Sequence, residues 1–245
     1  MSTLTLRLAG PLQAWGSTAR FARRTTESAP TKSGVIGLLA ATAGIDRADD
    51  EQLQALAALR FGVRIDQPGT RLRDFQTAHH RVTGESMPLS ERFYLADAVF
   101  VAALEGDRQL LERLHTALKQ PVYMPFLGRR SCPPAQPVEL GLHHESDLLQ
   151  ALTAEPWQAS AWYRRRHRHD TTVKLAALLE APGTADADVQ RDQPLSFDPH
   201  HRRHALRTVA HKTIALPNPA ATPLQTPASS VPRHDPFAAL GEESP

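Results

Sequence analysis

The stretch Leu4-Thr5-Leu6-Arg7-Leu8 opens the interpretation of this sequence, because apolar and polar residues alternate along it. Such alternation is typical of a β-strand with one buried face. After this strand, a polar and basic loop over residues 10–32 leads into an apolar stretch. Ser33 can cap a helix there, and Gly44 ends it. The chain therefore begins as strand, loop and helix.

The following residues continue this alternation of strands and helices. Asp49 or Asp50 caps a second helical stretch, and Asp107 caps a later helix with a stripe of leucines. Strands are expected at 61–66 and 95–104, a hairpin-like excursion between them at 70–93, and a fourth strand at either 122–126 or 138–142. The order strand, helix, strand, strand, helix, strand predicts an α+β protein with a ferredoxin-like (RRM-like) core.

The second half of the sequence is less regular. Residues 146–152 are expected to be helical, 173–179 and 208–216 to be strands, and 186–199 to be acidic and turn-rich. The last 29 residues contain seven prolines and little apolar periodicity, which is typical of a disordered tail. We therefore expect a core over 1–145, an irregular, partly β accessory region over 146–216, and a Pro-rich tail over 217–245.

The composition is that of an ordinary globular protein, with 41% hydrophobic and 6% aromatic residues. Cys132 is the single cysteine, which excludes an internal disulfide framework and a cysteine-rich metal site. The N-terminus lacks the features of a secretory signal, and no apolar run approaches the about 20 residues of a membrane span. These observations predict a cytoplasmic protein without membrane contact.

The net charge of +2 hides a segregation of charge along the chain. Basic residues gather in three runs, at 1–32, 164–170 and 200–212. Each run could be a solvated face, but three separate runs favour binding of a polyanion.

A search for catalytic patterns finds little. No metalloprotease or hydrolase motif occurs, and the histidines lack the spacing of a metal site, so neither metal nor cofactor is expected. Lys32 and Ser33 at a helix start could bind an anion, or be a plain cap beside a solvated lysine. An RNA-cleaving site could use His79, His80, Tyr94 or Lys212, although spacing alone does not bring them together.

Five strings in this order carry a family resemblance: LRLAGPLQAWG at 6–16, PTKSGVIGLLA at 30–40, LRDFQT at 72–77, ERFYLADAVF at 91–100 and YMPFLGRRSCP at 123–133. They resemble the CasD family of Cascade subunits in type I-E CRISPR immunity, within the CRISPR-associated RAMP superfamily. The resemblance covers about residues 4–140 and implies a protruding thumb at about 74–94.

The resemblance also implies a function. Proteins of this family bind and cap the 5′ handle of crRNA, and they contact the backbone subunit CasC and the large subunit CasA. The resemblance implies only an indirect contact with target DNA, and it implies no catalysis. The alternative, taken from a related subtype, is a metal-independent endoribonuclease that processes CRISPR repeat RNA.

Candidate RNA-binding residues follow from the matched strings, the basic loops and the thumb. They are Gln13, Trp15, Arg20, Arg23, Arg24, Lys32, Ser33, Arg73, His79, His80, Arg81, Arg129, Arg130 and Ser131. The two expected central strands contain one aromatic residue between them, Phe100, so loops and helix ends are expected to hold the RNA.

Overall fold

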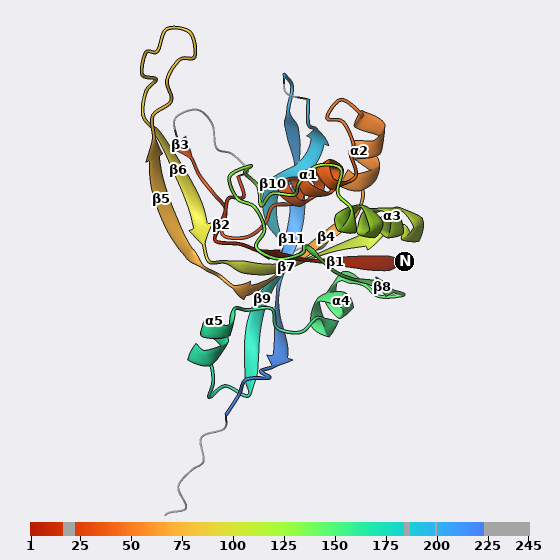
Figure 1. Ribbon diagram of the computed structural model, residues 1–245. Coiled ribbons are helices and arrows are strands. Elements are labelled where there is room, and N and C mark those ends of the chain that lie inside the picture. The colour runs from red at the N-terminus through yellow and green to blue at the C-terminus, as the bar shows by residue number, and fades with distance from the viewer. Residues whose placement is uncertain (17–22, 184–186, 199, 223–245) are drawn as a thin grey trace, which may run out of the picture.

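The computed structural model describes residues 1–16, 23–183, 187–198 and 200–222. Its elements are, in chain order, β1 (Ser2–Ala9), β2 (Leu12–Gln13), β3 (Arg23–Arg24), α1 (Lys32–Thr42), α2 (Asp50–Ala57), β4 (Arg60–Gln67), β5 (Thr70–Gln76), β6 (Ser90–Ala96), β7 (Val99–Gly106), α3 (Arg108–Lys119), β8 (Glu139–His144), α4 (Leu148–Ala154), α5 (Ala161–Arg166), β9 (Thr172–Glu180), β10 (Asp188–Ser196) and β11 (Arg203–Pro217). The protein is therefore a mixed α/β molecule rich in strands (Figure 1).

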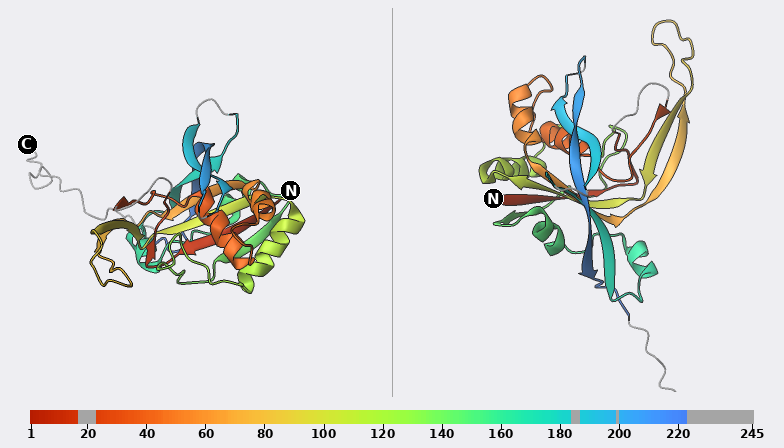
Figure 2. Two further views of the ribbon diagram at one scale, coloured as in Figure 1. Left: turned by 90° about the horizontal axis from the view of Figure 1, so that it is seen from above. Right: turned by 180° about the vertical axis from the view of Figure 1, so that it is seen from behind.

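A large antiparallel sheet organises the described part of the chain. Its seven strands lie in the order β10-β11-β9-β4-β7-β1-β8. Helices α1, α2 and α3 cover one face, and α4 and α5 lie on the other (Figures 1 and 2). Strand β7 serves both faces, since Phe100, Ala102 and Leu104 join one apolar cluster while Val101 and Ala103 join the other. This period of two gives the sheet a core on each side.

The helices begin where side chains cap them. Asp49 and Asp107 accept hydrogen bonds from the backbone N–H groups of Gln52 (3.0 Å) and Leu110 (2.9 Å), at the starts of α2 and α3. For α1 the cap is Thr31 rather than Ser33, because the helix already begins at Lys32. No helix in the described ranges is long and apolar enough to cross a membrane.

The excursion after β4 forms a long hairpin, β5–β6, that stands clear of the body (Figure 2). Strands β2 and β3 pair with β6 and complete a small second sheet. The sequence predicts one strand over 95–104, but the chain turns between Ala96 and Val99. Asp97 adopts a positive φ of 55° there and donates its N–H to the Pro11 oxygen (3.0 Å). The base of the hairpin is thereby tied to the loop after β1.

The C-terminal half extends the large sheet. Strand β8 at Glu139–His144 takes the fourth-strand position, so the second of the two expected segments is the correct one. The expected turn-rich segment 186–199 is instead largely strand β10, whose register shifts twice and which contains Pro194. As an edge strand β10 tolerates a proline that cannot donate to the ladder, and its bulges erase the local periodicity.

The structure describes the first residues of the expected tail, 217–222. Asn218 is buried, and its side-chain amide donates to the backbone oxygens of His167 (2.8 Å) and Asp170 (3.0 Å). The backbone N–H of Thr222 also donates to the Arg168 oxygen (2.7 Å). Hydrogen bonds therefore hold residues 218–222 to the segment that follows α5, and residues 223–245 lie outside the described part of the chain.

Candidate nucleic-acid interface

Four segments named by the sequence meet beside the base of the hairpin. Loop 10–16 pairs with β6 through Leu12 and Gln13, and β3 pairs with β6 further along the strand. Loop 127–131 closes over them, since the Ala14 N–H donates to the Leu127 oxygen (3.1 Å). Arg129 Nη2 donates to the Arg24 oxygen (2.9 Å). The expected binding residues of these loops therefore share one side of the molecule.

Gly128 makes this closure possible. Its φ is +82°, and a Cβ built there would lie 1.8 Å from the Ala14 backbone oxygen. Only glycine permits both the left-handed conformation and this approach of two backbones. The position of Arg129, Arg130 and Ser131 thus depends on this residue.

The side chains of Gln13 and Trp15 point inward. Both are fully buried, and Gln13 Nε2 donates to the backbone oxygens of Leu8 (3.0 Å) and Ala98 (2.8 Å). Trp15 Nε1 donates to Gln13 Oε1 (3.0 Å). These two side chains therefore fix the shape of loop 10–16 from within the protein.

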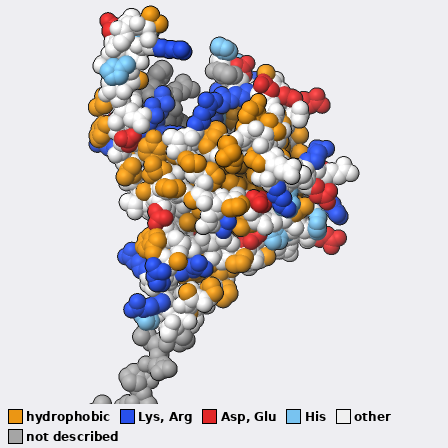
Figure 3. Space-filling model, in the orientation of Figure 1, with side chains coloured by type: hydrophobic (Ala, Val, Ile, Leu, Met, Phe, Trp, Pro, Cys, Tyr) orange, Lys and Arg blue, Asp and Glu red, His pale blue; other side chains and the backbone are white. Residues whose placement is uncertain are grey.

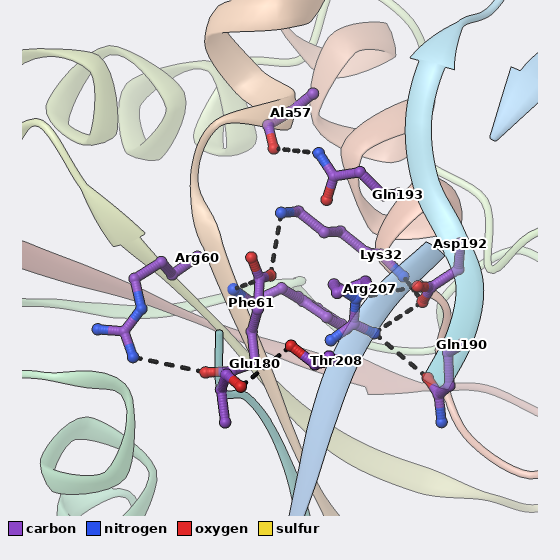
Figure 4. Close-up of polar contacts among 11 residues, drawn as sticks. Lys32, Ala57, Arg60, Phe61, Glu180, Gln190, Asp192, Gln193, Arg207 and Thr208 are labelled. Carbon is purple, nitrogen blue, oxygen red and sulfur yellow. Dashed lines mark hydrogen bonds and ion pairs between the residues drawn. The ribbon is translucent and has the colours of Figure 1, made fainter. Parts of the chain in front are cut away.

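Lys32 and Ser33 are also buried, and the anion site expected at the start of α1 already holds a carboxylate of the chain. Lys32 N–H donates to Asp192 Oδ2 (2.8 Å), while Lys32 Nζ lies 3.0 Å from Glu180 Oε2 (Figure 4). Burial lowers the pKa of Lys32, and the nearby Glu180 opposes that shift. Arg207 donates to both oxygens of Asp192 (2.9 and 2.8 Å). This network joins α1 to β9, β10 and β11.

Exposed arginines cover aromatic rings on the hairpin. The guanidinium carbons of Arg23 and Arg71 lie 5.4 and 4.7 Å from the centre of the Phe93 ring. Arg73 lies 4.5 Å from the ring of Phe75. Glu91 forms ion pairs with both Arg23 (3.8 Å) and Arg73. Stacking of this kind holds the cationic groups in place at the surface.

Arg129 combines these features. Its guanidinium carbon lies 4.7 Å from the centre of the Tyr94 ring, and its Nη1 is buried, with no hydrogen bond to any part of the chain that the structure describes. Arg24, Arg130 and Ser131 beside it are exposed. Arg129 is thus held between two loops, and the exposed arginines beside it can donate to phosphate oxygens. We call Arg23, Arg24, Arg71, Arg73, Arg129 and Arg130 the hairpin-base surface.

Three other expected residues of the described chain stand apart from this surface. His79, His80 and Arg81 are exposed near the hairpin tip, where His80 Nδ1 accepts from the Thr83 N–H (3.2 Å). Arg20 lies outside the described residues. Within the described ranges no group of three or more His, Cys, Asp or Glu could hold a metal ion.

Sequence reasoning missed Arg71 and the aromatic partners Phe75 and Phe93. The strand pairing places Leu72 opposite Tyr94 and Arg73 opposite Phe93. Arginines alternating with other residues on β5, facing a Phe-Tyr pair on β6, were the signal available in the sequence. Lys and Arg side chains gather visibly between the hairpin and the rest of the molecule (Figure 3).

The fold and this surface together define a mixed α/β protein with an arginine-rich face beside a projecting hairpin. The comparison with protein families then identifies it, because residues 3–210 match the family model described as CRISPR-associated protein (Cas_Cas5). The chain belongs to this Cas5 family.

Individual relatives agree. The CRISPR system Cascade subunit CasD of Escherichia coli (strain K12) is 39% identical over 169 residues, which are 62% of this chain and 75% of that protein. A solved structure described as a crystal structure of a Cas protein has a TM-score of 0.67 at 37% identity, covering 90% of this chain and 98% of the other. A chain of a CRISPR RNA-guided surveillance complex has a TM-score of 0.71 at 31% identity, covering 91% and 95%.

Proposed function

We propose that this protein is a subunit of a Cascade surveillance complex that binds and caps the 5′ handle of crRNA through the hairpin-base surface. Similarity to CasD and to a chain of an RNA-guided surveillance complex supports this proposal. The observation that carries it within the molecule is the set of exposed arginines from three separate segments around Arg129, whose guanidinium stacks on Tyr94 and donates to the Arg24 oxygen. A leader bound once and retained needs such phosphate contacts.

The fold proposal is finer than mixed α/β. The elements β1-α1-β4-β7-α3-β8 follow the order expected for a ferredoxin-like core, and their strands lie in the order β4-β7-β1-β8. We assign the hairpin β5–β6 as the thumb of that core. Residues 1–145 would then carry the RNA surface, with 146–216 as the accessory region that buttresses it through β4 and β9.

The hairpin also supports the proposed protein partners. Its apolar side chains are unusually exposed, namely Leu72, Phe75, Val82, Met87 and Leu89 at 43 to 88%. Exposed apolar groups of this number indicate a surface that another protein covers. We assign the thumb to the backbone subunit CasC and propose that the large subunit CasA docks beside the handle.

We propose that this subunit does not cut RNA. His79 and His80 lie near the hairpin tip, Tyr94 is buried beneath Arg129, and Lys212 lies on β11. These groups make no hydrogen bond with one another in the described chain, which supports a role without acid–base catalysis.

The test is copurification of the full chain with co-expressed Cascade subunits and repeat RNA, followed by sequencing of the bound RNA. We expect handle-containing RNA, uncut when the purified protein is incubated with repeat RNA in chelator. Arg129→Ala with Arg130→Ala should lower handle affinity about tenfold or more and reduce its salt dependence by about two phosphates. Arg108→Ala with Arg113→Ala, an equal loss of charge on α3, should leave both unchanged. Cleavage at the handle boundary, or equal effects of the two pairs, would contradict the proposal.

A further inference from the structure

A second basic surface lies on and after α5, on the opposite face of the large sheet from α1–α3. Residues 161–170 contain four arginines, Arg164, Arg165, Arg166 and Arg168, and one carboxylate, Asp170. Asp170 already pairs with His167 (2.9 Å), and no carboxylate of the described chain forms an ion pair with any of the four arginines. Figure 3 shows this group of Lys and Arg side chains well separated from the group beside the hairpin. We call the four arginines the α5 patch.

The chain holds α5 firmly although none of its residues is buried. Trp162 Nε1 donates to Asp97 Oδ2 (2.7 Å), which joins the helix to the hairpin base. The rings of Tyr163 and His167 pack edge-on against the buried Trp157, with centres 6.1 and 5.9 Å away. A short helix with no core of its own is thus anchored from both ends, so its arginines are presented in a fixed place.

Structural needs alone do not account for four arginines. One cation in the last turn complements the helix dipole. Arg165, Arg166 and Arg168 are exposed and shield no apolar core, so their charges remain available to a ligand. Four guanidinium groups within five residues match the closely spaced phosphates of a polyanion.

We infer that the α5 patch binds the sugar–phosphate backbone of a double helix, as a site separate from the hairpin-base surface. Stacking along a single strand would need several open aromatic faces, but Tyr163 and His167 pack on Trp157, which leaves Trp162, 45% exposed, as the one large aromatic side chain open to solvent in residues 161–170. An acidic protein partner would need an apolar centre, and Trp162 is the one large exposed apolar side chain in residues 161–170. A double helix offers two closely spaced series of phosphates to four guanidinium groups that have no carboxylate partner in the described chain.

The test compares the wild-type full chain with Arg165→Gln/Arg166→Gln/Arg168→Gln. The control is Arg108→Gln/Arg113→Gln/Lys119→Gln on α3, which removes the same charge from exposed positions. Fluorescence anisotropy measures binding to random-sequence DNA duplex, RNA duplex, single-stranded DNA, polyglutamate and handle RNA. Thermal unfolding shows that each variant folds.

We expect the α5 variant to bind duplex about tenfold or more weakly, with a salt slope smaller by about 2.7, while handle binding stays as in the wild type. Comparison of the DNA and RNA duplexes then tells which double helix is preferred. Four results would overturn the inference: no loss in the α5 variant, an equal loss in the control, a parallel loss of handle binding, or a wild-type preference for single strands or polyglutamate. Handle binding is measured independently, so its absence in the wild type contradicts the proposed function alone.

Discussion

Replacing Arg64 by methionine should remove one partner of a fully buried ion pair. Arg64 Nε and Nη2 donate to Asp66 Oδ1 (2.7 Å) and Oδ2 (2.8 Å), and both side chains are 0% exposed. The same guanidinium donates to the backbone oxygens of Leu152, Glu155 (2.7 Å) and Pro156 (2.8 Å). It therefore clamps the segment between α4 and α5 to β4.

The size of the effect follows from what is left behind. Methionine fills much of the volume but leaves the Asp66 carboxylate and three carbonyls without the guanidinium. Breaking a buried pair in this way costs about 3–5 kcal/mol of unfolding free energy. For a protein of this size we expect the melting temperature to fall by about 10 °C.

The loss should also depend on pH. Burial raises the pKa of Asp66, and the hydrogen bonds and charge of Arg64 oppose that rise. Without Arg64 the folded pKa moves further above the unfolded value, so the fold is favoured while the carboxyl is protonated and loses stability as pH rises through the folded pKa. The deficit of Arg64→Met should therefore be smaller at pH 5 than at pH 8.

Urea unfolding followed by tryptophan fluorescence measures this effect. Trp157 is a suitable reporter, since its indole N–H donates to the Asp66 backbone oxygen (2.9 Å). Adding Asp66→Asn removes the titrating carboxyl, so the double variant should recover part of the loss and show no such pH dependence. A deficit below about 1 kcal/mol, or one that is equal at both pH values, would refute the reasoning.

Three further changes test other contacts. Asp192→Ala leaves the buried Arg207 without its carboxylate and should cost about 3–5 kcal/mol of unfolding free energy. Asp188→Ala on the same strand removes an exposed pair with His211 and should cost less than about 1 kcal/mol; urea unfolding compares the two variants. Gly128→Ala should displace loop 127–131 and reduce handle affinity in anisotropy, while Gly84→Ala, also at positive φ but with open space around it, should leave handle affinity unchanged. Ending the chain after Thr222 should preserve the melting temperature, whereas ending it after Pro217 should lower it, because Asn218 and its two hydrogen bonds are lost.

Local patterns predicted much of the fold. Strand β1 forms where the alternation of Leu4, Leu6 and Leu8 predicts it, and helix α3 begins after the expected cap, Asp107. Both signals lie within a few residues of the element that they predict. The sequence did not predict the turn at Asp97, because this turn, with its positive φ, is held by a contact with the distant Pro11. Strand β10 was missed because its bulges and Pro194 break the period of two.

The candidate site was predictable in its loops more than in its side chains. The matched strings located loops 10–16 and 127–131, which the structure brings together. The burial of Lys32 could not be foreseen, since Asp192 follows it by 160 positions and no local pattern joins them. The arginine–aromatic stacks depend on the register between β5 and β6, which periodicity alone does not supply.

During synthesis on the ribosome, the two neighbours of β4 in the large sheet become available at different times. Its neighbour β7 follows soon, but β9, its other neighbour, is made about a hundred residues after β4 ends. Until then the nascent chain carries an open, apolar strand edge of the kind that pairs with other chains. Ribosome-stalled chains ending at residue 170 should therefore be cut in β4 by a protease that spares chains carrying all 245 residues. A cell that makes this subunit has to shield that edge until translation is nearly complete.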